Sequence, residues 1–283
     1  MSCAVREALS VLVLSLFVAA ISGAETAAEL LQSARTALTK GQTDQALKLI
    51  GEAIALEPKN PAPLLLRAAV RESQGKQEEA LADLNQVLQL DPKHAEAFDR
   101  RGSLHYKVGK FAASLSDFDK FLALSPKDSN GHWRRGITCY YAGAFDEGRK
   151  QFEGYEKVDT NDVENAVWHF LCVARASGVE KARASLLKIG KDGRVPMMEV
   201  YALYAGKIKP EEVLAAAQGG NPPAEKLSAQ LFYAHLYLGL YYEVMKDPKK
   251  AQEHMALAAE KYKIRHYMGD VAVVHLRVLQ EKK

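Results

Sequence analysis

Cysteine is scarce in this sequence. Among its 283 residues there are three. Cys3 lies in an apolar N-terminal segment, which leaves Cys139 and Cys172 in the rest of the chain. Two cysteines cannot supply the disulfide framework on which small secreted domains depend. Both stand in aromatic helical stretches, where cysteine commonly packs as a small apolar side chain. We therefore expect two buried free thiols, with a disulfide as the alternative if the two helices are neighbours.

Motifs for catalysis or metal binding are also missing. The sequence has no phosphate-cradling glycine loop, no G-x-S-x-G turn and no H-E-x-x-H motif. Its eight histidines are scattered, and none stands at a ligand spacing beside Cys, Asp or Glu. We therefore expect a protein with no catalytic residue, no cofactor and no metal. A metal-dependent or cell-wall enzyme is the least favoured alternative.

Charge of one sign is not concentrated in any stretch. The chain has 38 Lys and Arg against 35 Asp and Glu, a formal net charge of +3, and the two signs are interleaved. Surfaces that bind nucleic acid usually carry a concentrated basic stripe. The sequence instead predicts solvated helical surfaces and no nucleic-acid partner.

Long apolar runs are confined to the N-terminus. The run from Ala8 to Ile21 follows the basic Arg6, and Ser22-Gly23-Ala24 supplies the small residues of a cleavage site. This pattern predicts a signal peptide over residues 1–24, cleaved after Ala24. The protein would then be secreted or periplasmic, with no membrane span left after cleavage. An uncleaved membrane anchor is the alternative, because the run approaches the roughly 20 residues that a spanning helix needs.

The first half of the chain repeats with a period of 34 residues. Pro58, Pro92 and Pro126 stand at this spacing. Small residues such as Gly102 and Gly136 recur where two helices would approach closely. Glycines also recur where a tight turn is expected, at Gly41, Gly75, Gly109 and Gly143.

This period and these residues resemble the tetratricopeptide repeat, a unit of two helices. The resemblance implies an all-α fold, a right-handed solenoid of stacked antiparallel helix pairs. No strand or hairpin pattern speaks against it. In register, the repeats cover residues 27–60, 61–94, 95–128 and 129–162.

The second half of the chain, residues 163–283, reads as degenerate helical repeats. A loop rich in turn formers is expected at 188–196, followed by an insertion of short helices near 197–218. A returning repeat-like pair is expected over 228–263. A last helix near Tyr267–Gln280 would cap the apolar end of the stack.

The resemblance to this repeat also implies a concave groove lined by the first helix of each pair. The inward positions turn aromatic toward the fourth repeat, and aromatic and Arg side chains are enriched at binding hot spots. We therefore predict partner binding at Tyr106, Trp133, Ile137, Tyr140 and Tyr141, with Arg100 and Arg134 close by. Equally, an aromatic stripe at helical spacing is often core. In that case it packs against residues 163–190 or against a C-terminal helix folded into the groove.

The order of parts further resembles the new lipoprotein I family of the bacterial envelope. The stretches that carry this resemblance are Glu199–Gly206, Phe232–Tyr242 and Pro248–Ala251. It implies a dimeric adaptor that brings a periplasmic protease together with cell-wall hydrolases. No Cys follows the apolar run directly, so no lipid anchor is expected. The sequence thus favours a non-catalytic scaffold that binds a partner peptide or helix in its groove, with a self-assembling homodimer as the alternative.

Overall fold

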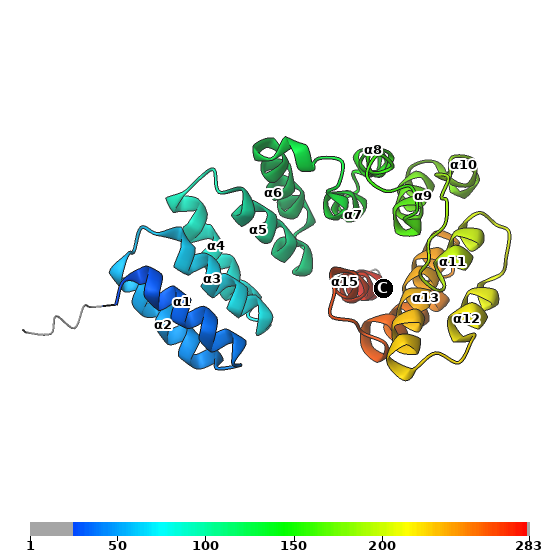
Figure 1. Ribbon diagram of the computed structural model, residues 1–283. Coiled ribbons are helices and arrows are strands. Elements are labelled where there is room, and N and C mark those ends of the chain that lie inside the picture. The colour runs from blue at the N-terminus through cyan, green and yellow to red at the C-terminus, as the bar shows by residue number, and fades with distance from the viewer. Residues whose placement is uncertain (1–24, 282–283) are drawn as a thin grey trace, which may run out of the picture. The chain divides into compact units, whose positions relative to one another are not determined.

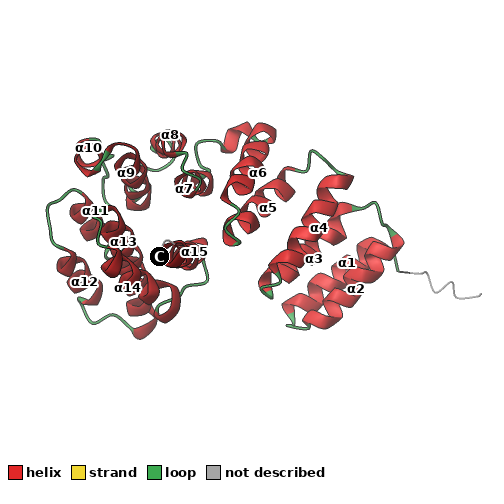
Figure 2. Ribbon diagram, turned by 180° about the vertical axis from the view of Figure 1, so that it is seen from behind, coloured by secondary structure: helices red, strands yellow, loops and turns green. Residues whose placement is uncertain are grey.

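A computed structural model describes residues 25–281, and every regular element among them is a helix (Figures 1 and 2). The predicted all-α fold is therefore confirmed. The helices divide into two compact units, with the boundary after Pro58. The predicted signal peptide, residues 1–24, lies outside the described residues. Within residues 25–281, no helix has both the length and the apolar character needed to cross a membrane.

The first unit contains one helix pair. Helix α1 (Ala27–Thr39) begins after Thr26, whose hydroxyl accepts a hydrogen bond from the Glu29 amide, while the Glu29 carboxylate accepts one from the Thr26 amide. This reciprocal cap satisfies two amides near the start of the helix. Helix α2 (Thr43–Leu56) packs against α1 after a turn at Gly41, whose φ is +72°.

The second unit continues with three more pairs. They are α3 (Pro61–Ser73) with α4 (Gln77–Leu90), α5 (Ala95–Lys107) with α6 (Phe111–Leu124), and α7 (Trp133–Tyr141) with α8 (Phe145–Tyr155). A short 3-10 helix, η1 (Pro126–Asp128), lies between α6 and α7. The turn glycines of these pairs, Gly75, Gly109 and Gly143, have φ values of +75°, +80° and +78°. Only glycine adopts that conformation at no steric cost, which explains its recurrence.

Close helix contacts explain the other recurring glycines. A Cβ atom added at Gly102 would lie 2.8 Å from the ring of Phe118, and one added at Gly136 would lie 2.6 Å from the ring of Phe152. These distances are shorter than van der Waals contact, so a larger residue would force the two helices apart. The prediction that small residues mark the contacts within the pairs is confirmed.

A ladder of polar side chains follows the same period of 34 residues. Its basic members are Arg67, Arg101, Arg135 and His169. The arginines donate to acceptors within their own repeat, namely Asp83, Asp117 and Gln151, at 2.7, 2.7 and 3.5 Å. The last three members also contact side chains of the preceding repeat, namely Asn85, Asp119 and Glu153, at 2.8, 2.6 and 3.4 Å. We call this set the basic ladder; it links the two helices of a repeat and links successive repeats.

The C-terminal part of the second unit folds back toward the repeats. Its helices are α9 (Val163–Ser177), α10 (Val179–Ala184), α11 (Met197–Tyr204), α12 (Pro210–Gln218), α13 (Ala224–Val244), α14 (Pro248–Ala256), the π-helical turn η2 (Leu257–Lys261) and α15 (Tyr267–Glu281). Helices α11 and α12 are the expected short helices, and α13 and α14 form a packed pair. Helix α15 packs on α14, as a cap would, and also reaches α5. Both views show it between the repeats and the returning pair (Figures 1 and 2).

Both remaining cysteines are free and buried, as expected. They approach the same glycine: a Cβ atom added at Gly148 would lie 2.8 Å from Cys172 Sγ and 3.2 Å from Cys139 Cβ. Burial raises the pKa of the Cys139 thiol to about 11 and raises the pKa of Cys172 well above its usual value. Both groups are therefore protonated at neutral pH, and a protonated thiol is a poor nucleophile.

Candidate functional site

The aromatic residues predicted to bind a partner gather on α5 and α7. We call Tyr106, Trp133, Ile137, Tyr140 and Tyr141 the aromatic groove. Helix α15 lies against it. The ring of Tyr267, at the start of α15, stacks on Tyr106 with centroids 5.3 Å apart. It also meets Trp133 edge to face at 5.1 Å. The groove therefore already holds a helix of the same chain.

Polar contacts fix α15 in this place. The Tyr141 hydroxyl and His275 Nδ1 are 3.0 Å apart. Lys107 Nζ lies 3.0 Å from an Asp270 carboxylate oxygen, and Arg277 donates to the Lys107 carbonyl at 3.3 Å. These contacts are spread along α15, so the whole helix is held and not only its first turn.

The aromatic stripe is largely buried in this structure. Tyr106, Ile137 and Tyr140 are 0%, 1% and 4% exposed. They form part of the core beneath α15, so the alternative of a C-terminal helix folded into the groove describes the structure. Trp133 and Tyr141 are half-buried. Binding of a partner by this set stays a prediction, and in this conformation a partner reaches only its edges.

The two predicted arginines are held by polar side chains of α5. Arg134 donates to the Asp99 carboxylate and to the Ser103 hydroxyl, each at 2.8 Å. Arg100 pairs with Glu96 on its own helix at 2.8 Å. Both guanidinium groups are thus engaged with α5. Arg134 also lies over the ring of Phe118, 5.8 Å from its centroid.

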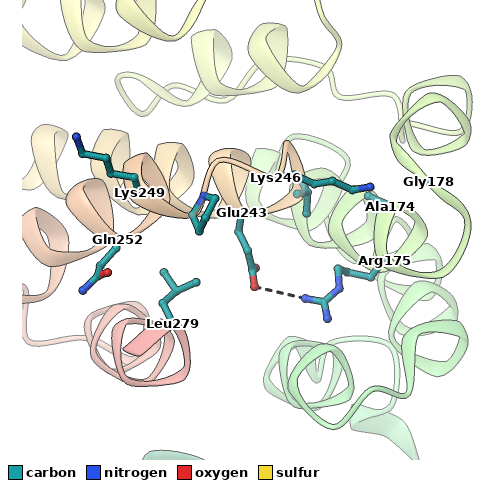
Figure 3. Close-up of a pocket in the computed structure, with 10 residues that line it drawn as sticks. Ala174, Arg175, Gly178, Glu243, Lys246, Lys249, Gln252 and Leu279 are labelled. Atoms are coloured by element: carbon teal, nitrogen blue, oxygen red, sulfur yellow. Dashed lines mark hydrogen bonds and ion pairs between the residues drawn. The ribbon is translucent and has the colours of Figure 1, made fainter. Parts of the chain in front are cut away.

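Glu243, near the end of α13, joins the groove to the returning helix pair. It accepts a hydrogen bond from the Tyr140 hydroxyl at 2.8 Å and lies 3.5 Å from Arg175 Nη1 (Figure 3). Its carboxylate is also 3.5 Å from His275 Nε2. Burial, with the charge of Glu243 nearby, holds the pKa of Tyr140 well above its usual value, so the hydroxyl keeps its proton and donates.

A small pocket opens at the edge of the aromatic groove. Its volume is about 200 Å³. We call it the Trp133 pocket. Its walls come from α7, α8, α9, the first turn of α15 and the residues just before α9 and α15. The lining residues are Trp133, Ile137, Phe152, Tyr155, Asp162, Glu164, Asn165, Trp168, His266 and Met268. Two predicted residues, Trp133 and Ile137, therefore reach a cavity, and the rest of its wall was not predicted.

One wall of the Trp133 pocket is acidic. Arg194, from the loop before α11, contacts Asp162 and Asp192 at 2.8 and 2.6 Å and also pairs with Glu164. Three carboxylates share one guanidinium, so the cluster keeps an excess of negative charge. Burial disfavours the charged form and raises the pKa of Asp162 and of Glu164, whereas Arg194 favours the charged form of both. Arg194 follows Glu164 by 30 positions and Asp162 by 32, which is why no local pattern revealed the cluster.

Within residues 25–281, no group of three His, Cys, Asp or Glu side chains is arranged to hold a metal ion. The closest histidine contact joins His235 and His254, whose Nδ1 atoms are 2.8 Å apart.

Comparisons with known proteins agree on the repeat. Two family models, each described as a tetratricopeptide repeat, match residues 31–95 and 78–135. No curated protein matches the chain significantly. A tetratricopeptide repeat protein from Parabacteroides merdae has a similar solved structure, with a TM-score of 0.57 at 17% identity over 90% of this chain and 98% of that one. MamA from Desulfovibrio magneticus RS-1 gives a TM-score of 0.52 at 19% identity, over 57% of this chain and 91% of that one.

At such low identities these structures show the fold alone. The likeness to the new lipoprotein I family has no support among these matches and stays a prediction. Repeats of this kind present extended surfaces on which other proteins bind.

Proposed function

Because the chain is a tetratricopeptide-repeat protein, we propose that it is a non-catalytic adaptor that anchors a partner protein in the Trp133 pocket. The observation that carries this proposal is an open aromatic cavity with an acidic wall beside a groove that α15 already fills. A partner peptide or helix would run along the edge of the concave surface and insert one side chain. Two residues of the aromatic groove, Trp133 and Ile137, would form part of the pocket wall.

The size and chemistry of the pocket indicate the inserted side chain. Small-molecule sites usually measure about 300–1,000 Å³, whereas this pocket of about 200 Å³ suits a single side chain. Aromatic faces and carboxylates both attract a cation. We therefore propose Lys or Arg as the anchor. Its stem would pack on Ile137 and Met268, and its charge would lie near Asp162 and Glu164.

The cell envelope is the proposed location of this adaptor. The predicted signal peptide and the resemblance to the new lipoprotein I family support this placement. A periplasmic protease or a cell-wall hydrolase is the kind of partner that the resemblance implies. If the partner is instead a second copy of the chain, the purified protein will be a dimer. Asp162→Asn and Trp133→Ala should then weaken the association of the two copies.

Selection from a random library of displayed peptides tests the proposal. We expect the enriched peptides to share one Lys or Arg at a fixed position beside apolar residues. The variant Asp162→Asn should lower their affinity about tenfold, or about 1.4 kcal/mol. Asn caps a helix about as well as Asp, so α9 keeps its start while the charge is lost. Trp133→Ala should lower the affinity by at least as much.

The matched control is Asp247→Asn, which changes the cap of α14 in the same way but lies outside the pocket. It should leave peptide affinity unchanged. Enriched peptides without a basic residue would contradict the proposal. So would peptides that bind wild type and Asp162→Asn equally well.

A further inference from the structure

A second, larger cavity lies between the returning helices and α15. Its volume is about 880 Å³. Figure 3 shows the residues that surround it, which come from α9, α13, α14 and α15 and from the turns beside them. They are Ala174, Arg175, Gly178, Glu243, Val244, Lys246, Pro248, Lys249, Gln252 and Leu279. We call it the basic cleft. Its size is enough for several residues of a peptide and is far larger than the Trp133 pocket.

Positive charge dominates the rim of the basic cleft. Lys246 and Lys249 are both exposed, and among the described residues neither ammonium group has a hydrogen-bond or ion-pair partner. The only carboxylate in the lining belongs to Glu243, which is engaged with Tyr140 and Arg175. Two lysines are therefore available to a ligand. The apolar side chains of Val244, Pro248 and Leu279 also line the cleft.

The backbone at Lys246 adopts a left-handed conformation that glycine adopts in the other repeat turns. The turn between α13 and α14 has the hydrogen bonds of the other repeat turns: the Lys246 amide donates to the Glu243 carbonyl, and the next amide donates to the Tyr242 carbonyl. In the first four repeats this place is held by glycine with φ between +72° and +80°. Here a lysine adopts φ +62°. A side chain in this region is sterically unfavourable, so this chain carries a lysine where glycine would be easier.

We propose that the basic cleft binds an acidic segment of a partner protein. Carboxylates of the segment would contact Lys246 and Lys249 at the rim, and its apolar side chains would lie on Val244 and Leu279. Charge complementarity selects this occupant, because a basic or neutral segment would leave both lysines without partners. The surface is separate from the Trp133 pocket and has the opposite charge.

Fluorescence anisotropy with a labelled probe tests this proposal. The probe is a capped decapeptide of alternating Glu and Leu, and its counterpart has Gln in place of each Glu. We expect the acidic peptide to bind at least tenfold more tightly than its counterpart, and its affinity to fall as salt screens the lysines. The double variant Lys246→Gly/Lys249→Ala should weaken binding at least tenfold. The single variant Lys246→Gly should melt no lower than wild type, because glycine accepts this turn more easily.

The control variant Lys226→Ala/Lys263→Ala removes the same charge from exposed positions outside the cleft. It should bind the acidic peptide as wild type does. Equal affinity for the Glu and Gln peptides would overturn the proposal, as would undiminished binding by Lys246→Gly/Lys249→Ala. Trp133→Ala should bind the acidic peptide with wild-type affinity. The Trp133 pocket is tested with basic peptides, so the proposal for the basic cleft can fail while the proposal for the pocket holds, and the reverse.

Discussion

The side chains of His235 and His254 meet between α13 and α14. Their Nδ1 atoms are 2.8 Å apart, a contact that needs one donor and one acceptor. The ring of Tyr262 stacks on His235, and that of Tyr242 stacks on His254. Burial, the nearby His254 and the charge of Lys261 lower the pKa of His235 to about 4. The pair therefore favours the neutral form while the protein is folded.

This pair should make the protein less stable in mild acid. An unfolded histidine titrates near pH 6.5. Between about pH 6.5 and 4 the unfolded chain therefore binds protons that folded His235 does not, and the free energy of unfolding falls as the pH falls. Urea denaturation at a series of pH values would measure the slope, with His235→Phe as a ring of similar shape that cannot titrate. An identical pH dependence in both proteins would contradict this role.

Among the helices, the basic ladder is the feature with the clearest energetic consequence. Burial alone would raise the pKa of Asp117, but hydrogen bonds from His105 and Arg101 outweigh burial and lower it. The side chain of Asp117 is 4% exposed, and its two partners are also largely buried. The carboxylate compensates buried positive charge inside the third repeat.

Removal of that carboxylate should be costly. We expect Asp117→Ala to lower the free energy of unfolding by about 3–5 kcal/mol, because it leaves the largely buried Arg101 without a carboxylate to balance its charge. Asp119, whose side chain is 51% exposed, also bonds an arginine of the ladder. Asp119→Ala should cost less than about 1 kcal/mol. Chemical denaturation of both variants gives the comparison, and similar losses would mean that the ladder is not a buried network.

The helices were predictable because their signals are local. Proline and glycine at a period of 34 mark turns, and the small Gly102 and Gly136 mark close contacts, so each repeat carries its own evidence. The place of α15 has no such signal. Its apolar face shows that it packs on something, but the same pattern suits a cap at the end of the stack or a helix in the groove. Likewise, the sequence shows Arg194 only as a polar residue in a loop. The fold brings the carboxylates of Asp162 and Glu164 to its guanidinium group.

At the scale of the whole molecule, the second unit is a repeat array that fills its own aromatic groove. Among the cavities that it leaves open, two differ in charge, the acidic Trp133 pocket and the basic cleft. An adaptor of this design would bind through the edges of α15 and its neighbours while the groove stays closed. Two predicted residues, Tyr106 and Tyr140, then support the binding surface without touching a partner, whereas Ile137 lines the Trp133 pocket.

Hydrogen exchange of the free protein, followed by mass spectrometry, tests this closed groove most directly. Amides in a helix that is part of the core exchange only through large-scale opening, whereas a loosely attached terminal helix exchanges through local opening. We expect the amides of α15 to exchange about as slowly as those of α5 and α7. Exchange of α15 that is many times faster than that of α5 and α7 would contradict the closed groove, and would leave the aromatic side chains free for a partner helix.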